Sequence, residues 1–127
     1  MEYRGRRILA AVQDIFFAAK ITAAAKRVGV NVEFIREEDK LLQTAESSPS
    51  LVILDLNNSG INSLELVRKL KTNSPQRDVQ IIAYLSHVQQ ELMRQAQNAG
   101  CDFVVARSVF SQNLDDLLRQ HSCLPSD

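Results

Sequence analysis

The chain alternates between short apolar runs and longer stretches in which apolar residues recur at helical spacing. The runs are rich in β-branched and aromatic side chains and too short for helices: Ile8–Val12, Val32–Ile35, Leu51–Leu56, Val79–Leu85 and Phe103–Val105. Such runs are typical of strands that helices cover on both faces of a parallel sheet. We therefore predict five strands, each buried on both faces.

The stretches between these runs predict amphipathic helices, because their apolar residues fall on one stripe. The stripes consist of Phe17, Ile21, Ala24 and Val28; of Leu64, Val67 and Leu70; of Val88, Leu92, Ala96 and Ala99; and of Phe110, Leu114, Leu117, Leu118 and His121. Gly29 and Gly100 follow two of the stripes as C-terminal caps, and Asn62 and Glu65 have capping-box spacing. A weaker helix is expected over Glu38–Ser47, with Ser48-Pro49 ending it.

This alternation of strands and helices predicts an α/β fold in which helices cover both faces of a parallel sheet. Right-handed crossovers leave few topologies, and for five strands we expect the flavodoxin-like order 2-1-3-4-5 in a three-layer sandwich. The chain of 127 residues fits a single domain, with a core over about residues 6–121 and a short tail at 122–127.

Composition narrows the class of protein. Fifteen basic and fifteen acidic residues cancel, which argues against a nucleic-acid-binding surface because phosphate backbones require a positive excess. No apolar run approaches the roughly 20 residues of a membrane span, and the N-terminus lacks a signal-peptide core. Cys101 and Cys123 suggest neither a metal site nor a disulfide framework. We expect a cytoplasmic protein.

Ligands of parallel sheets collect at the carboxyl ends of the strands. Asp55 ends the most apolar strand, where an unpaired carboxylate is costly, and this favours a functional role. Asp14 and Ser86 also follow strands, but each is equally well explained as a helix N-cap, with Gln89 completing a capping box for Ser86. The other polar residues at these strand ends are Gln13, Asn57 and Arg107.

Residues 6–121 resemble the receiver domain of two-component response regulators. The stretch LVILDLNNSGINSLELV resembles the third strand of that family and the loop and helix after it, with Asp55 at the phospho-accepting position. The resemblance assigns Asp14 to the second acid of the Mg²⁺-binding pair and Asn57 to the residue whose backbone carbonyl binds Mg²⁺. It assigns Ser86 to the hydroxyl that follows the phosphoryl group.

The chain also departs from the family pattern. Gln13 replaces the first acid, and the Lys-Pro after the fifth strand is absent. The family lysine falls on Arg107 when counted from Gly100 and on Ala106 when counted from Phe103. Asn58-Ser59 replaces Met-Pro and Asn62-Ser63 replaces Asp-Gly. Because Gln13 offers a neutral carbonyl where a carboxylate is favoured, we expect only weak Mg²⁺ binding by Gln13, Asp14, Asp55 and Asn57.

These features predict a degenerate receiver, a signalling module that acts by protein–protein interaction with impaired or absent phosphorylation. The alternative is a working phosphoreceiver in which Asp55, Ser86 and Arg107 handle the phosphoryl group with Mg²⁺. Expected partners are a histidine kinase or a downstream signalling protein, contacted through the fourth helix, fifth strand and fifth helix; a homodimer is compatible with the sequence. An exposed Phe16, about 100° from the stripe of Phe17, is a further contact candidate.

An enzyme on the same fold is disfavoured. The chain has four glycines and no glycine-rich phosphate loop after the first strand. Asp55-Leu56-Asn57 has an asparagine where haloacid-dehalogenase-like phosphatases carry the second aspartate. We therefore expect a protein without enzymatic activity.

Overall fold

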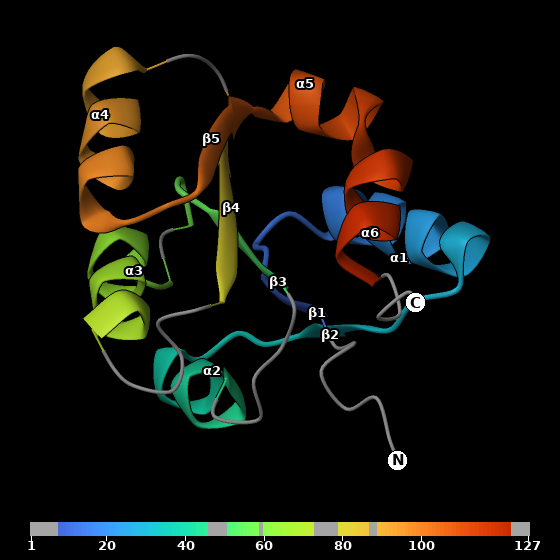
Figure 1. The fold of residues 1–127 in the computed structure, drawn as a ribbon, viewed down its shortest axis with the longest axis horizontal. Helices are drawn as coiled ribbons and strands as arrows, with labels where there is room; N and C mark the ends of the chain where they lie inside the picture. Colours follow the sequence, from blue (N-terminus) through green and yellow to red (C-terminus); the bar gives the residue numbers. More distant parts are fainter. Residues whose placement is uncertain (1–7, 46–50, 59, 73–78, 87–88, 123–127) are drawn as a thin grey trace.

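The computed structural model describes residues 8–45, 51–58, 60–72, 79–86 and 89–122. These residues form one five-stranded parallel sheet in the order β2-β1-β3-β4-β5, which confirms the predicted fold (Figure 1). The strands are β1 (Ile8–Ala11), β2 (Val32–Phe34), β3 (Leu51–Asp55), β4 (Gln80–Leu85) and β5 (Phe103–Ala106). The helices are α1 (Ile15–Val28), α2 (Glu38–Ala45), α3 (Ser63–Thr72), α4 (Gln90–Ala99), α5 (Arg107–Gln112) and α6 (Leu114–Ser122).

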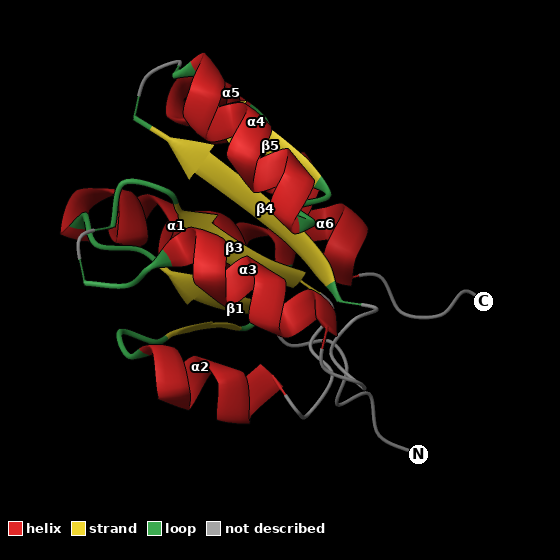
Figure 2. Ribbon diagram, turned by 90° about the vertical axis from the view of Figure 1, so that its left-hand side faces the viewer, coloured by secondary structure: helices red, strands yellow, loops and turns green. Residues whose placement is uncertain are grey.

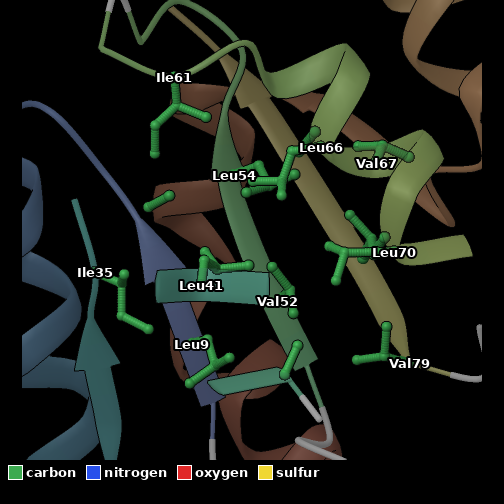
Figure 3. Close-up of a cluster of buried hydrophobic side chains, with 14 residues drawn as sticks. Leu9, Ile35, Leu41, Val52, Leu54, Ile61, Leu66, Val67, Leu70 and Val79 are labelled. Carbon is green, nitrogen blue, oxygen red and sulfur yellow. The ribbon is translucent and has the colours of Figure 1, made fainter. Parts of the chain in front are cut away.

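Helices cover the sheet on both sides, as the pattern of apolar runs predicts (Figures 1 and 2). Alternate residues of β3 serve opposite faces: Leu51 and Ile53 pack with α1 and α6, whereas Val52 and Leu54 pack with α2 and α3. Figure 3 shows the second of these clusters, in which Leu54 lies among side chains of the flanking helices. Residues 8–11 of β1 and 51–54 of β3 are therefore all apolar, because helices cover both faces of these strands.

The two edge strands differ from the prediction that every strand is buried on both faces. In β2, both Glu33 and Phe34 are exposed. In β5, the Phe103 side chain is 52% exposed. An edge strand has a neighbour on one side only, so the flanking helices leave part of it in contact with solvent.

The predicted helix ends are present for three helices. Gly100 ends α4 with φ of 124° and donates its N–H to the carbonyls of Ala96 and Gln97. Gly29 ends α1 with φ of 79°, in the left-handed region, and donates its N–H to the carbonyl of Ala25. At the start of α3, Asn62 Oδ1 accepts the N–H of Glu65 at 3.1 Å. Three other predicted positions lie outside the described residues: Val88 in the stripe before Gly100, Ser48-Pro49 after the second helix, and the side chain of His121 in the last stripe.

The last apolar stripe forms two helices rather than the predicted one, with a break at Asn113. The Asn113 side-chain amide donates to the Val109 carbonyl at 2.9 Å, and the Asn113 backbone N–H shares that acceptor at 3.2 Å. Phe110 and Leu114 on either side remain buried against the sheet. The apolar period therefore places the side chains correctly, whereas it does not predict that α5 ends at Asn113. Within the described residues, no helix has the length and apolar character needed to cross a bilayer.

Candidate functional site

The carboxyl ends of four strands bring the predicted polar residues to one edge of the sheet. β1 leads into Gln13 and Asp14, and β3 ends at Asp55. Ser86 follows β4, and Arg107 follows β5 as the first residue of α5. We call Gln13, Asp14, Asp55 and Arg107 the acid cluster, because two carboxyl groups and one guanidinium dominate its electrostatics.

Asp14 has two roles in the structure. Its Oδ1 atom accepts the backbone N–H groups of Phe16 at 2.8 Å and of Phe17 at 3.4 Å, which caps α1. Its Oδ2 atom accepts Nη1 of Arg107 at 3.0 Å. The N-cap explanation of Asp14 is therefore confirmed, and the same carboxylate also belongs to the cluster at the strand ends.

Arg107 reaches the acid cluster although the sequence left its register open. Ala106 is the last residue of β5 and carries no charge, whereas Arg107 begins α5 and pairs with Asp14. The Arg107 guanidinium carbon lies 5.9 Å from the centroid of the Phe17 ring. This position over an aromatic face adds a cation–π contact to the ion pair.

Asp55 is buried at the end of β3, with 7% of its surface exposed. Burial raises the pKa of its carboxyl group, because a low-dielectric surrounding disfavours the charged form. The backbone N–H of Asn57, at 2.8 Å from Oδ1, and that of Gln13 lower the pKa, as does the charge of Arg107. Desolvation outweighs these three effects and the smaller lowering effect of the neighbouring Tyr84 hydroxyl on the pKa, so the carboxylate of Asp55 is incompletely compensated.

Tyr84 is a member of the site that sequence reasoning missed. It is paired in register with Asp55 across β3 and β4, and 1% of its surface is exposed. Its ring packs against Phe17 and Phe110, with centroids 4.8 and 5.5 Å away. Among the described residues, its hydroxyl is the buried side-chain oxygen without a hydrogen-bond partner. Burial and the Asp55 charge raise the pKa of Tyr84. The only available signal was a tyrosine within an apolar strand beside an acidic strand end.

Asn57 joins the ends of β3 and β4 through its side chain. Its Oδ1 accepts the backbone N–H of Ser86 at 2.8 Å and the Ser86 hydroxyl at 3.1 Å, and its Nδ2 donates to Gln89. The N-cap explanation of Ser86 is wrong, because α4 begins at Gln90 and Gln89 occupies its N-cap position. The Ser86 hydroxyl bonds to Asn57 instead, and Asn57 therefore couples the two loops.

Ser63 is a second residue that the sequence did not single out. Its buried hydroxyl donates to the backbone carbonyl of Asp55 at 2.9 Å, which fixes the end of β3 to the start of α3. This contact positions the Asp55 main chain, so the carboxyl direction depends on α3 as well as on the sheet.

The donor set does not fit a tightly held divalent cation. No group of three or more acidic, histidine or cysteine side chains is placed to hold a metal within the described ranges. Both oxygens of Asp14 accept hydrogen bonds, and Gln13 contributes no charge. Hard cations bind best where several carboxylate oxygens converge. Asp14 and Asp55 supply the two carboxylates here, and only weak binding is expected from them.

Comparison with known proteins places the fold among response regulators. The chain matches no established family model. It is 37% identical over 81 residues to the transcriptional activator protein ExaE of Pseudomonas putida, covering 60% of this chain. The chain spans 37% of the length of that curated relative.

Several solved structures match this chain closely in fold but only weakly in sequence. A response regulator from Hahella chejuensis matches with a TM-score of 0.82 at 19% identity, over 95% of this chain and 98% of that one. The signal receiver domain of a Bermanella marisrubri response regulator matches with a TM-score of 0.77 at 23% identity, over 94% and 99%.

A third neighbour contains a metal. The receiver domain of the sensor histidine kinase PA1611 from Pseudomonas aeruginosa, with magnesium in its active-site cleft, has a TM-score of 0.78 at 18% identity. That match covers 93% of this chain and 98% of the neighbour. At these identities the likenesses define the fold: this chain has the CheY-like receiver fold.

Proposed function

We propose that this chain is a receiver-type signalling module that acts by binding a partner protein and does not depend on phosphorylation of Asp55. The fold it shares with response regulators supports the signalling role. The proposal assigns it no catalytic turnover and a cytoplasmic location. Its partners are then a histidine kinase or a downstream signalling protein.

The contacts of Asp14 support the proposal that the chain does not depend on phosphorylation of Asp55. Phosphoryl transfer to a carboxylate needs a divalent cation to offset charge on the phosphoryl oxygens. Gln13 is neutral, and Asp14 is already bonded by the first turn of α1 and by Arg107. Asp55 is thus left with no second free carboxylate to share a cation.

Two exposed apolar surfaces support binding of a partner protein. Ile15 and Phe16 are 65% and 80% exposed at the start of α1, beside the acid cluster. The second surface is a hollow of about 150 Å³ between β5 and α5–α6, lined by Ile82, Phe103, Val105, Val109, Phe110, Asn113 and Leu117. The second surface overlaps the region of β5 and α5 that the sequence favours for partner contact.

Labelling with a small phosphodonor tests the proposal directly. Wild-type protein and Asp55→Asn are incubated with the phosphodonor, with and without Mg²⁺, and the intact masses are compared. We expect no Mg²⁺-dependent adduct on either protein. A stoichiometric adduct on the wild type that Asp55→Asn abolishes contradicts the proposal and supports the alternative.

One observation favours that alternative, a working phosphoreceiver. Asp55 stands at the carboxyl end of β3, and the Asn57 side chain holds the Ser86 hydroxyl at the end of the neighbouring strand. This arrangement leaves a hydroxyl beside the edge at which a phosphoryl group on Asp55 would stand. In that case Mg²⁺, when bound, would offset the phosphoryl charge, and Asp14 and Asp55 would supply its carboxylate ligands.

A further inference from the structure

We infer that the Arg107 guanidinium is a built-in substitute for the divalent cation, so that a cation binds Asp14 only when the Arg107–Asp14 pair opens. The inference rests on the proposed function, because it explains how the site works without a metal. It concerns one contact, in which Arg107 Nη1 lies 3.0 Å from Asp14 Oδ2.

The two oxygens of Asp14 are not equivalent toward a cation. Oδ1 accepts the N–H groups of Phe16 and Phe17, and it faces the N-terminal end of α1. That end carries partial positive charge, which disfavours a second positive charge beside it. Oδ2 is therefore the atom through which Asp14 would bind a cation, and Arg107 occupies it.

Arg107 is held in this position by more than the ion pair. It directly follows β5, so its backbone is tied to the edge of the sheet. Its guanidinium lies over the ring of Phe17, a buried residue whose own N–H bonds to Asp14. The first turn of α1 thus supplies both the anion and the aromatic face that Arg107 contacts. A cation that displaced Arg107 would have to break both contacts.

The charges of the acid cluster agree with this role. Asp14 and Asp55 bring two carboxyl groups to the edge, and Arg107 is the cationic side chain whose charge acts on Asp55. One guanidinium therefore pairs with Asp14 and also lowers the pKa of Asp55, so its positive charge acts on both acids. Arg107 cannot dissociate from the chain, so the compensation does not depend on the cation concentration in the cell.

A cation titration of charge variants tests the inference. Mn²⁺ is added to the wild type and to Arg107→Gln, and paramagnetic broadening of the backbone amide signals of Gln13 and Phe16 is followed by NMR. We expect Arg107→Gln to bind Mn²⁺ about tenfold more tightly, because a like charge beside the ligand is gone. Calorimetric titration with Mg²⁺ should likewise show tighter binding to Arg107→Gln than to the wild type.

Lys20 provides the matched control. It lines the same polar hollow as Arg107, but its Nζ donates to Ser111 at 3.0 Å. Lys20→Gln removes the same charge without freeing Asp14, and we expect its affinity for Mn²⁺ to match the wild type. If Lys20→Gln and Arg107→Gln strengthen binding equally, the effect is one of general charge and the inference is wrong.

A second variant covers the case in which Arg107→Gln fails to fold. Arg107→Met keeps an unbranched apolar stem against Phe17 and should show the same gain in affinity. Equal Mn²⁺ affinities for the wild type and a folded Arg107 variant overturn the inference. This outcome is separate from the phosphodonor test. Labelling of Asp55 can succeed or fail whether or not the Arg107 variants bind Mn²⁺ more tightly than the wild type.

Discussion

Tyr84 lies opposite Asp55 in the pairing of β3 with β4, which places a buried phenol beside a buried carboxyl at the carboxyl ends of the strands. The carboxyl has a raised pKa because it is desolvated, and the phenol oxygen has no hydrogen-bond partner within the described part of the chain. The desolvated carboxyl and the buried hydroxyl without a partner therefore both reduce stability.

Tyr84→Phe should leave the protein equally stable or stabilise it by up to about 1 kcal/mol. The substitution keeps the ring between Phe17 and Phe110 and removes a buried hydroxyl that has no partner. Urea unfolding followed by circular dichroism measures the change. A loss of more than about 1 kcal/mol would instead show that the hydroxyl donates to Asp55 in solution.

Asp55→Asn should likewise be neutral or stabilising near neutral pH, by about 1 kcal/mol. The amide fills the same space and removes a desolvated charge, while Asn57 N–H can still donate to the side-chain oxygen. Thermal or urea unfolding checks this. Partner binding should be unchanged, and a strong loss of stability would mean that Arg107 compensates the carboxylate fully.

The pH dependence of that gain has a defined sign. The pKa of Asp55 is raised from its ordinary value of 3.8, so protonation favours the folded state. This contribution is fully present below the unfolded-state pKa and is lost as pH rises through the folded-state pKa. The advantage of Asp55→Asn over the wild type should therefore vanish in acid and appear as pH rises through that range.

Asp115 gives the control of opposite sign. Arg27 lowers the pKa of Asp115, which favours the folded state when the carboxylate is ionised. That contribution is present above the unfolded-state pKa and is lost as pH falls through the folded-state pKa. Asp115→Asn should therefore reduce stability at neutral pH and have little effect in acid. Unfolding curves of both variants over the same pH series separate the two signs.

Phe16 and Phe17 are neighbours with opposite environments, 80% and 5% exposed. Phe17→Ala should cost about 3–5 kcal/mol because it empties a packed position against Tyr84 and Phe110. Phe16→Ala should change stability by about 0.5 kcal/mol or less. Chemical unfolding of the two variants gives the comparison. Large and equal losses at both positions would remove the case for Phe16 as a partner contact.

Gln13→Asp should strengthen Mg²⁺ binding, because it adds a carboxylate at the edge that already holds Asp14 and Asp55. Without the cation the same variant should be less stable than the wild type, since a third acid joins two others. Calorimetric titration and unfolding with and without Mg²⁺ measure the two effects. Tight binding by the wild type, unchanged in Gln13→Asp, would show that the site is assigned wrongly.

Most of the fold could be predicted from the sequence, because several strands show the same apolar pattern independently. The run Leu51–Leu56 is apolar on both faces only if helices cover both sides of its strand, and the other central strands give the same indication. Gly29 and Asn62 mark helix ends through chemistry that is local to the chain. Asn113 lies within a regular apolar period, so nothing in that period indicates that one helix ends there and a second begins at Leu114.

The site was less predictable because its contacts join residues far apart in the chain. The sequence left Asp14 open between a helix cap and a functional acid, and in the structure Oδ1 caps α1 while Oδ2 pairs with Arg107. Arg107 pairs with it across 93 positions, which no spacing rule reveals. Tyr84 looked like one more apolar strand residue, because its register against Asp55 exists only once the sheet has formed.

The break at Asn113 has a consequence for the timescales on which the molecule opens. A helix of six residues, such as α5, is too short to be stable alone, and Phe110 is its one buried residue. Amide protons of α5 should therefore exchange with solvent through local opening, while those of β3 exchange only when the whole domain unfolds. Since Arg107 begins α5, its contact with Asp14 cannot persist longer than the interval between openings of a single short helix.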